Sequence, residues 1–174
     1  MSATNGGANL RREAMEEHYN HELYKKNNTS YTFKIISALS IGKIKIVAYK
    51  RNQDNTRIDM AEFYIGYKEF NAILMAIKRA LNNKKEYSKE LVGGDDGGRT
   101  VYINLKYAPQ LSLGFRMFDN LIMKKSEKTK DYTGKVGFVI KSYEDILEFI
   151  LLKDTIDNWE LANINKILNQ GFRK

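Results

Sequence analysis

The sequence predicts an α+β fold made of two tandem units, each an antiparallel β-sheet followed by a helix. Residues 56–82 pass directly from a strand-like run into an amphipathic helix, and residues 135–156 repeat this pattern. A second block is repeated upstream, where residues 31–41 align with residues 101–111. Because both blocks recur in the same order, we expect a duplicated chain.

Composition favours an anionic partner. The 174 residues include 29 Lys and Arg against 21 Asp and Glu, which gives a formal net charge of +8 and a match to nucleic acid or an anionic surface. The chain has no cysteine, so disulfides, thiolate metal sites and cysteine nucleophiles are excluded. It has no apolar run suited to a signal peptide or a spanning helix, so we expect no membrane association and an intracellular protein, cytoplasmic or nucleoid-associated.

The predicted elements follow in order, with hairpin-length connections that require antiparallel pairing. The first unit has strands at 31–37, 41–50 and 57–65 and a helix at 67–82, and the second has strands at 100–107, 111–125 and 135–140 and a helix at 143–152. A bulge or bend is expected at residues 118–120, where the alternation breaks. The resulting divisions are a tail and N-terminal helix (1–29), the first unit (30–82), a flexible linker (83–98) and the second unit with a C-terminal helix (99–174).

Two further helices are expected at the ends. Residues 10–26 have an imperfect apolar stripe, and residues 158–168 carry Trp159 on a packing face. The first of these helices contains His18 and His21, whose spacing could bring two imidazoles to one face for a metal. No other residues complete such a site, so a solvated face is the better interpretation and no metal site is predicted.

The second predicted strand has one basic and one apolar face. Alternation places Lys43, Lys45 and Tyr49 on the first, and residues 44, 46 and 48 on the second. Lysines on such a face bind phosphates or, in the alternative interpretation, only prevent edge pairing. No acyl-transfer constellation is present, and Asp59 and Glu62 point to opposite faces of one strand. We therefore predict no catalytic residue, no enzyme activity and no cofactor.

The run RIDMAEFY at residues 57–64, followed by a helix that begins YKEF, resembles the signature of the single-stranded-DNA-binding positive cofactor four family. The tandem arrangement is similar to the Whirly proteins of plants and the mitochondrial guide-RNA-binding proteins, and this similarity implies that the two units form a pseudo-dimer in one chain. The resemblance implies four strands per unit, where the pattern here gives three, and Ala61 stands at an arginine-like position of the signature.

In that family, basic and aromatic residues on the outer sheet hold an unpaired strand. Carried over to this sequence, the resemblance implies a nucleic-acid-binding set formed by Lys43, Lys45, Tyr49, Lys50, Arg51, Arg57, Lys106, Arg116, Phe118, Lys124 and Lys125.

The expected function is therefore single-stranded nucleic-acid binding, with DNA favoured over RNA, in replication, recombination or transcription. The alternative is an accessory or inhibitory module of a mobile element that binds an acidic protein. The sequence leaves open whether the chain forms a homo-oligomer and whether the second unit binds or only packs.

Overall fold

The computed structural model describes residues 21–38, 41–94, 97–125 and 132–165, which form two four-stranded antiparallel sheets and accompanying helices. The predicted α+β class is thus confirmed. The N-terminal sheet has the order β1 (Glu22–Asn27), β2 (Tyr31–Ala38), β3 (Lys43–Arg51) and β4 (Arg57–Gly66). The C-terminal sheet has the order β5 (Tyr87–Gly93), β6 (Arg99–Lys106), β7 (Ser112–Asp119) and β8 (Lys135–Lys141).

Helix α2 (Tyr67–Asn82) has the predicted bounds. Its apolar residues recur with helical period and lie buried: Phe70, Ile73, Leu74, Ile77 and Leu81. Glu69 in the first turn and Arg79 in the last match the polarity of the helix dipole. The helix therefore forms because its amphipathic pattern coincides with the surface that the sheets offer.

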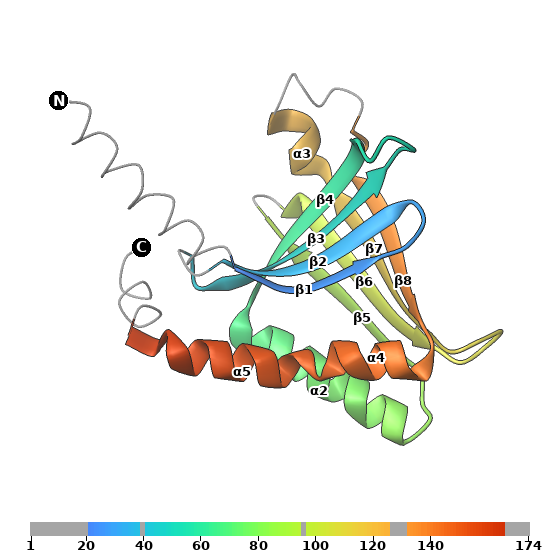
Figure 1. Cartoon of the computed structure of the whole chain (residues 1–174), viewed down its shortest axis with the longest axis vertical. Coiled ribbons are helices and arrows are strands. Elements are labelled where there is room, and N and C mark those ends of the chain that lie inside the picture. Colours follow the sequence, from blue (N-terminus) through green and yellow to red (C-terminus); the bar gives the residue numbers. More distant parts are fainter. Residues whose placement is uncertain (1–20, 39–40, 95–96, 126–131, 166–174) are drawn as a thin grey trace.

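Three shorter helices complete the described structure: α3 (Asn120–Lys125), α4 (Tyr143–Ile150) and α5 (Leu152–Ala162). The Ser142 hydroxyl caps α4 by accepting a hydrogen bond of 3.2 Å from the Asp145 backbone N–H. Figure 1 shows α2, α4 and α5 together at one end of the sheets and α3 at the opposite end. None of the helices in the described ranges has the length and apolar character to cross a bilayer.

The predicted N-terminal helix over residues 10–26 is wrong for residues 22–26, which belong to β1; residues 10–20 lie outside the described part of the chain. Strand β1 pairs with β2, from Glu22 opposite Ile36 to Asn27 opposite Thr32. Backbone pairing to β2 decides the conformation here, because local propensity in such a short polar segment is weak.

The segment predicted as a flexible linker, residues 83–98, contains strand β5, which pairs with β6 along its whole length. Each unit therefore has four strands rather than three. The last helix also differs: α5 begins at Leu152 and ends at Ala162, whereas residues 158–168 were expected, and residues 166–168 are not among the described ones.

The inner faces of the two sheets meet around Phe33. Its ring lies 4.6 Å from the ring of Phe115 and 5.2 Å from that of Phe138, measured between centroids. Phe149 of α4 adds an edge contact to Phe115 at 5.5 Å. In α5, the half-buried Trp159 stacks on Tyr67 of α2, with 6.0 Å between the ring centroids. This contact agrees with the packing role predicted for Trp159. One continuous core thus joins both sheets to the helices.

Two carboxylates link the sheets outside this core. The Asp59 side chain of β4 accepts hydrogen bonds from the backbone N–H groups of Thr133 (3.0 Å) and Gly134 (3.1 Å), just before β8. The Asp119 carboxylate accepts a hydrogen bond of 3.0 Å from the Glu62 backbone N–H of β4, and bonds of 3.1 Å from the N–H groups of Leu121 and Ile122. The irregularity predicted at residues 118–120 is therefore the end of β7 and the start of α3, rather than a bulge within one strand.

Candidate nucleic-acid interface

The alternating pattern of β3 is confirmed by burial at every position from Lys43 to Tyr49 except Val47, which is buried between Lys45 and Tyr49. Ile44, Ile46 and Ala48 are fully buried in the core, so Lys45 and Tyr49 project from the opposite, outer face. The strand register extends this face across the N-terminal sheet. Lys45 lies opposite Tyr64, Tyr49 opposite Thr32 and Met60, and Lys34 opposite Lys25. The outer face therefore combines cations with tyrosines, as predicted.

A pocket of about 400 Å³ opens at the hairpin end of this face. We call it the basic pocket; it is lined by Lys25, Asn27, Thr32, Tyr49, Arg51, Asn55 and Arg57. Three of its residues are cations and none is acidic. In the described part of the chain, none of the ion pairs involves Lys25, Arg51 or Arg57. Their positive charges are therefore not neutralised by a neighbouring carboxylate.

Arg51 is held in place by neutral acceptors. Its Nε donates to the Thr32 hydroxyl at 3.0 Å, and its Nη2 donates to the Asn28 and Tyr31 carbonyl oxygens at 2.6 and 3.2 Å. Its Nη1 donates to the Asn55 side chain at 3.1 Å. Arg51 thus joins the two hairpins and leaves a fixed positive charge in the wall of the basic pocket.

Arg57 lies over the face of Tyr49, with its Cζ 4.2 Å from the ring centroid, close enough for a cation–π interaction. The Lys34 ammonium approaches the same ring at 5.8 Å. Partial burial acts to raise the pKa of the Tyr49 phenol, but the Thr32 hydroxyl and the nearby cations outweigh it and lower this pKa below its ordinary value. The surroundings of Tyr49 therefore favour negative charge.

Lys45 is less available than the alternation suggests. Its Nζ lies 3.6 Å from the Glu62 carboxylate, and its side chain is 22% exposed. Glu62 also lies 3.9 Å from Arg99, which donates to Asp119 at 3.1 Å. Lys45 is thus the outermost member of a charge network, and Glu62 offsets part of its attraction for a phosphate.

The outer face of the C-terminal sheet carries a second, smaller cluster. The Arg116 Cζ lies 5.1 Å from the Tyr102 ring centroid, and this ring meets Phe118 edge-on at 5.8 Å. The register places Tyr102 directly opposite Arg116 and Phe118 opposite Lys135. Arg116 is exposed and both rings are half-buried, so a cation and two aromatic faces lie together.

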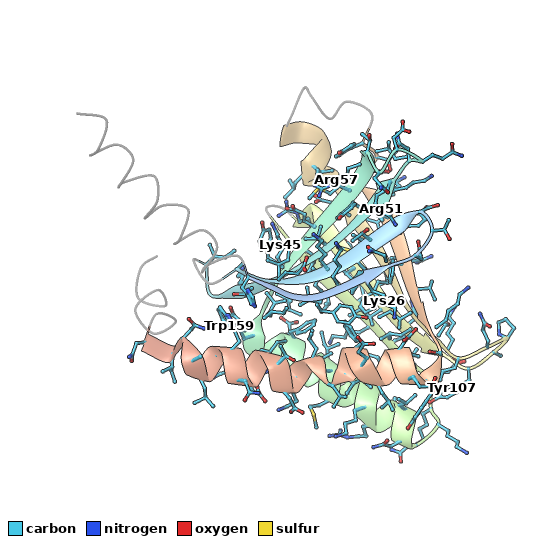
Figure 2. All side chains as sticks on the ribbon, in the orientation of Figure 1. Lys26, Lys45, Arg51, Arg57, Tyr107 and Trp159 are labelled. Carbon is cyan, nitrogen blue, oxygen red and sulfur yellow. The ribbon has the colours of Figure 1, made fainter. Side chains whose placement is uncertain are left out.

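The remaining predicted residues lie apart from these two clusters. Lys43 is exposed at the start of β3, Lys106 is exposed at the end of β6, and Lys50 extends over the Tyr31 ring at 6.0 Å. Lys124 and Lys125 close α3, and their side chains lie outside the described part. Figure 2 shows Lys45, Arg51 and Arg57 in the strand-rich part of the molecule, away from Tyr107 and Trp159 at the helical end.

Four residues on these faces are absent from the predicted set: Lys25, Lys34, Tyr64 and Tyr102. Lys25 was missed because its segment was predicted to be helical. Strict alternation within the correctly predicted strands could have found Lys34 and Tyr64, which lie opposite members of the basic face. Alternation in β6 already places Tyr102 on the side of Lys106.

Within the described ranges, no group of three or more His, Asp or Glu side chains is arranged to hold a metal ion. His21 lies just before β1 and its backbone carbonyl accepts a hydrogen bond from the Ser37 N–H at 2.8 Å, while His18 falls outside the described residues. The helical face proposed to carry both histidines is therefore not formed at His21.

Neither a protein-family model nor a curated protein sequence matches this chain. Among solved structures, it is similar to WHY3 from Arabidopsis thaliana, with 10% identity, a TM-score of 0.46 and coverage of 83% of this chain and 92% of that one. It is also similar to the plant transcriptional regulator PBF-2, with 9% identity, a TM-score of 0.47 and coverage of 84% and 87%. The Whirly family, whose tandem units the sequence resembles, is thus also found among the structural neighbours.

Proposed function

We propose that this chain binds single-stranded nucleic acid, with single-stranded DNA as the first expectation, through the outer faces of its two sheets. The observation that carries the proposal is the set of unneutralised cations in the basic pocket, next to a sheet face bearing tyrosines. Cations that follow a phosphate backbone release counterions on binding. Exposed aromatic faces accept unpaired bases, which a duplex keeps stacked within the helix.

The two sheets have different roles in this proposal. The N-terminal sheet offers mainly charge, through Lys25, Arg57 and the fixed Arg51. The C-terminal sheet offers Arg116 with two aromatic rings, of which Phe118 supplies a stacking surface. A nucleic-acid strand that contacts both sheets would combine phosphate and base contacts. Such contacts give affinity with little sequence preference.

The repeat gives this arrangement its second surface. Each unit has the same strand order, and each places a basic and aromatic cluster on its outer face. We interpret the chain as a pseudo-dimer, in which duplication supplies the two surfaces that a homodimer would obtain from two copies. The clusters contain no nucleophile paired with a base, so the proposed role is binding without catalysis.

The test is fluorescence anisotropy of a labelled mixed-sequence single-stranded DNA at two salt concentrations, with unlabelled duplex DNA and single-stranded RNA as competitors. We expect tighter binding to the single strand than to the duplex, weaker at the higher salt. A double variant, Arg57→Ala with Arg116→Ala, should lose most of the affinity and retain its circular dichroism spectrum. Lys78→Ala, which removes an exposed charge from α2, is the matched control.

Equal affinity for duplex and single strand would contradict the proposal, because bare charge attracts both. If no nucleic acid binds even at low salt, the alternative of an acidic protein partner for the same cations becomes the better account. A folded double variant with unchanged affinity would show that binding occurs elsewhere on the molecule.

A further inference from the structure

The basic pocket differs from the rest of the outer face in its charge balance. Two other cations of this face are paired: Lys34 lies 3.1 Å from Glu22, and Lys45 lies 3.6 Å from Glu62. In the basic pocket, Lys25, Arg51 and Arg57 converge on a space of about 400 Å³ without an acidic lining residue. Such a concentration of like charge is unfavourable unless an anion binds between the side chains.

The three cations are not equivalent. Arg51 uses donors on all three of its nitrogens for carbonyl, hydroxyl and amide acceptors, so it contributes charge but few free hydrogen bonds. Lys25 and Arg57 are exposed. Arg57 donates one N–H to the Met60 sulfur at 3.3 Å, so its other N–H groups and the Lys25 ammonium can turn toward an anion that the fixed charge of Arg51 has attracted.

Tyr49 does not offer an open face to a base at this point. The Arg57 guanidinium covers its ring at 4.2 Å, so a stacked base would have to displace this contact. The phenol instead adds a hydrogen-bond donor beside the cations. This arrangement suits a phosphate group better than a nucleobase.

The charge of the pocket indicates which phosphate. The pocket lies at the hairpin end of the sheet, between the turn that follows β1 and the turn that joins β3 to β4, both tied by Arg51. Its three cations, gathered without an acidic residue, suit a group that carries more than one negative charge. An internal phosphodiester carries one negative charge, whereas a terminal phosphomonoester carries about 1.5 to 2 at pH 7 and offers three acceptor oxygens.

We propose that the basic pocket binds the terminal phosphomonoester of a single strand, held by Lys25 and Arg57 in the field of Arg51. The inference rests on the proposed function, and it adds that the protein distinguishes phosphorylated ends from hydroxyl ends. Because Arg51 also holds the hairpins together, it is unsuitable for a test by substitution.

The experiment compares three DNA oligomers of identical sequence, with a 5′-phosphate, a 3′-phosphate or hydroxyls at both ends, each labelled on an internal base. We expect one phosphorylated oligomer to bind about tenfold tighter than the hydroxyl form, the gain from one charge-assisted interaction. Lys25→Ala and Arg57→Ala should each remove this gain, whereas Lys78→Ala should keep it. Nucleoside monophosphate, added as a separate competitor, should reduce the gain without abolishing binding of the hydroxyl oligomer.

Equal affinities for all three oligomers would overturn the inference and leave the proposed function intact, since the strand would still bind. A gain that survives in both pocket variants would also overturn it, because the terminal phosphate would then lie elsewhere. If nucleoside monophosphate displaces the hydroxyl oligomer completely, the pocket is a free-nucleotide site and the end-recognition inference is wrong. Absence of all oligomer binding in wild-type protein would reject both proposals together.

Discussion

The backbone N–H of Glu62 in β4 donates a hydrogen bond of 3.0 Å to the carboxylate of Asp119 at the end of β7. The same carboxylate accepts from Arg99 and from the first turn of α3, and its side chain is fully buried. Asp119 therefore links the N-terminal sheet directly to the end of β7 and the start of α3. Through Glu62 it also adjoins Lys45 on the outer face.

Asp119→Ala should be among the most destabilising single substitutions. It leaves the buried Arg99 with only the Glu62 carboxylate, at 3.9 Å, and removes the acceptor of backbone donors in β4 and α3, so we expect a loss of about 3 to 5 kcal/mol in the free energy of unfolding. Urea denaturation followed by circular dichroism measures this loss. Asp54→Ala, in the exposed turn between β3 and β4, should change the stability by less than about 0.5 kcal/mol. Similar midpoints for the two variants would contradict the role assigned to Asp119.

Gly134→Ala tests the close contact between the turn just before β8 and the end of β7. Gly134 has a φ of +69°, and an added Cβ would collide with the carbonyl oxygen of Asp119. Backbone strain alone should cost about 1 to 3 kcal/mol, and the collision adds to it. In Gly114→Ala, the new Cβ would find its nearest neighbour, the Asn104 carbonyl oxygen, at 3.9 Å, so this variant is the matched control. If both variants unfold at the same denaturant concentration, the contact between Gly134 and Asp119 is not rigid.

Tyr67→Phe should change how stability depends on alkaline pH. Burial raises the pKa of Tyr67 to about 12, with a smaller opposing effect from Ser37, whose hydroxyl lies 3.3 Å away. The folded state thus keeps a proton that the unfolded state loses above its ordinary pKa of about 10. The neutral phenol's contribution to the stability of the folded state is complete below pH 10 and is lost as the pH rises toward 12.

The difference in unfolding free energy between wild type and Tyr67→Phe should therefore be constant from pH 7 to 9. Above pH 10 the free energy of unfolding of the wild type should fall, relative to that of Tyr67→Phe, by up to about 1 kcal/mol per pH unit. Urea titrations of both proteins at matched pH measure this difference. A gap that stays constant up to pH 11 would show that the phenol is not desolvated in the folded protein.

Arg57→Ala should weaken single-strand binding more than Lys45→Ala. Arg57 has no carboxylate partner among the described residues, whereas Lys45 is partly neutralised by Glu62. Removing one cation that binds a phosphate lowers the slope of log affinity against log salt by about 0.7 for a single strand. We therefore expect Arg57→Ala to lower the slope by about this amount and Lys45→Ala by less. Anisotropy titrations at several salt concentrations give both slopes, and the reverse order would place the phosphates nearer to Lys45.

Phe118→Ala tests whether the C-terminal sheet takes part in binding single-stranded nucleic acid. Loss of one stacked base should cost about 1 to 3 kcal/mol of binding free energy while leaving the salt dependence unchanged, because no charge is removed. Val139→Ala, an exposed apolar position on β8 of the same sheet, controls for general effects of truncation. Unchanged affinity in folded Phe118→Ala would assign the C-terminal sheet a packing role only.

The limits of sequence reasoning are clearest at β1 and β5, the two strands it missed. Each begins its unit, lies at one edge of its sheet and buries a single residue, Tyr24 in β1 and Leu91 in β5. An edge strand that buries only one side chain needs no regular alternation of apolar and polar residues. Its sequence therefore carries almost no local signal, and pairing with the neighbouring strand decides its conformation.

The candidate site was predictable to the extent that alternation holds. Alternation within β3 placed Lys45 and Tyr49 on the outer face, because a strand that buries one face must expose the other. It could not reveal that Glu62 lies beside Lys45 or that Arg51 is committed to the hairpins. Those contacts join residues from different strands and depend on register.

The sequence by itself determined the α+β class, the repeated order of strands and helix, the bounds of α2 and the basic outer face, because each follows from a local apolar period or from total charge. Only the tertiary structure decided that each sheet has four strands, that Asp119 and Asp59 join the sheets, and that Lys25 converges with Arg51 and Arg57. The reason is physical: hydrogen bonds and charge convergence between distant segments depend on strand register and sheet packing, which no local pattern of residues encodes.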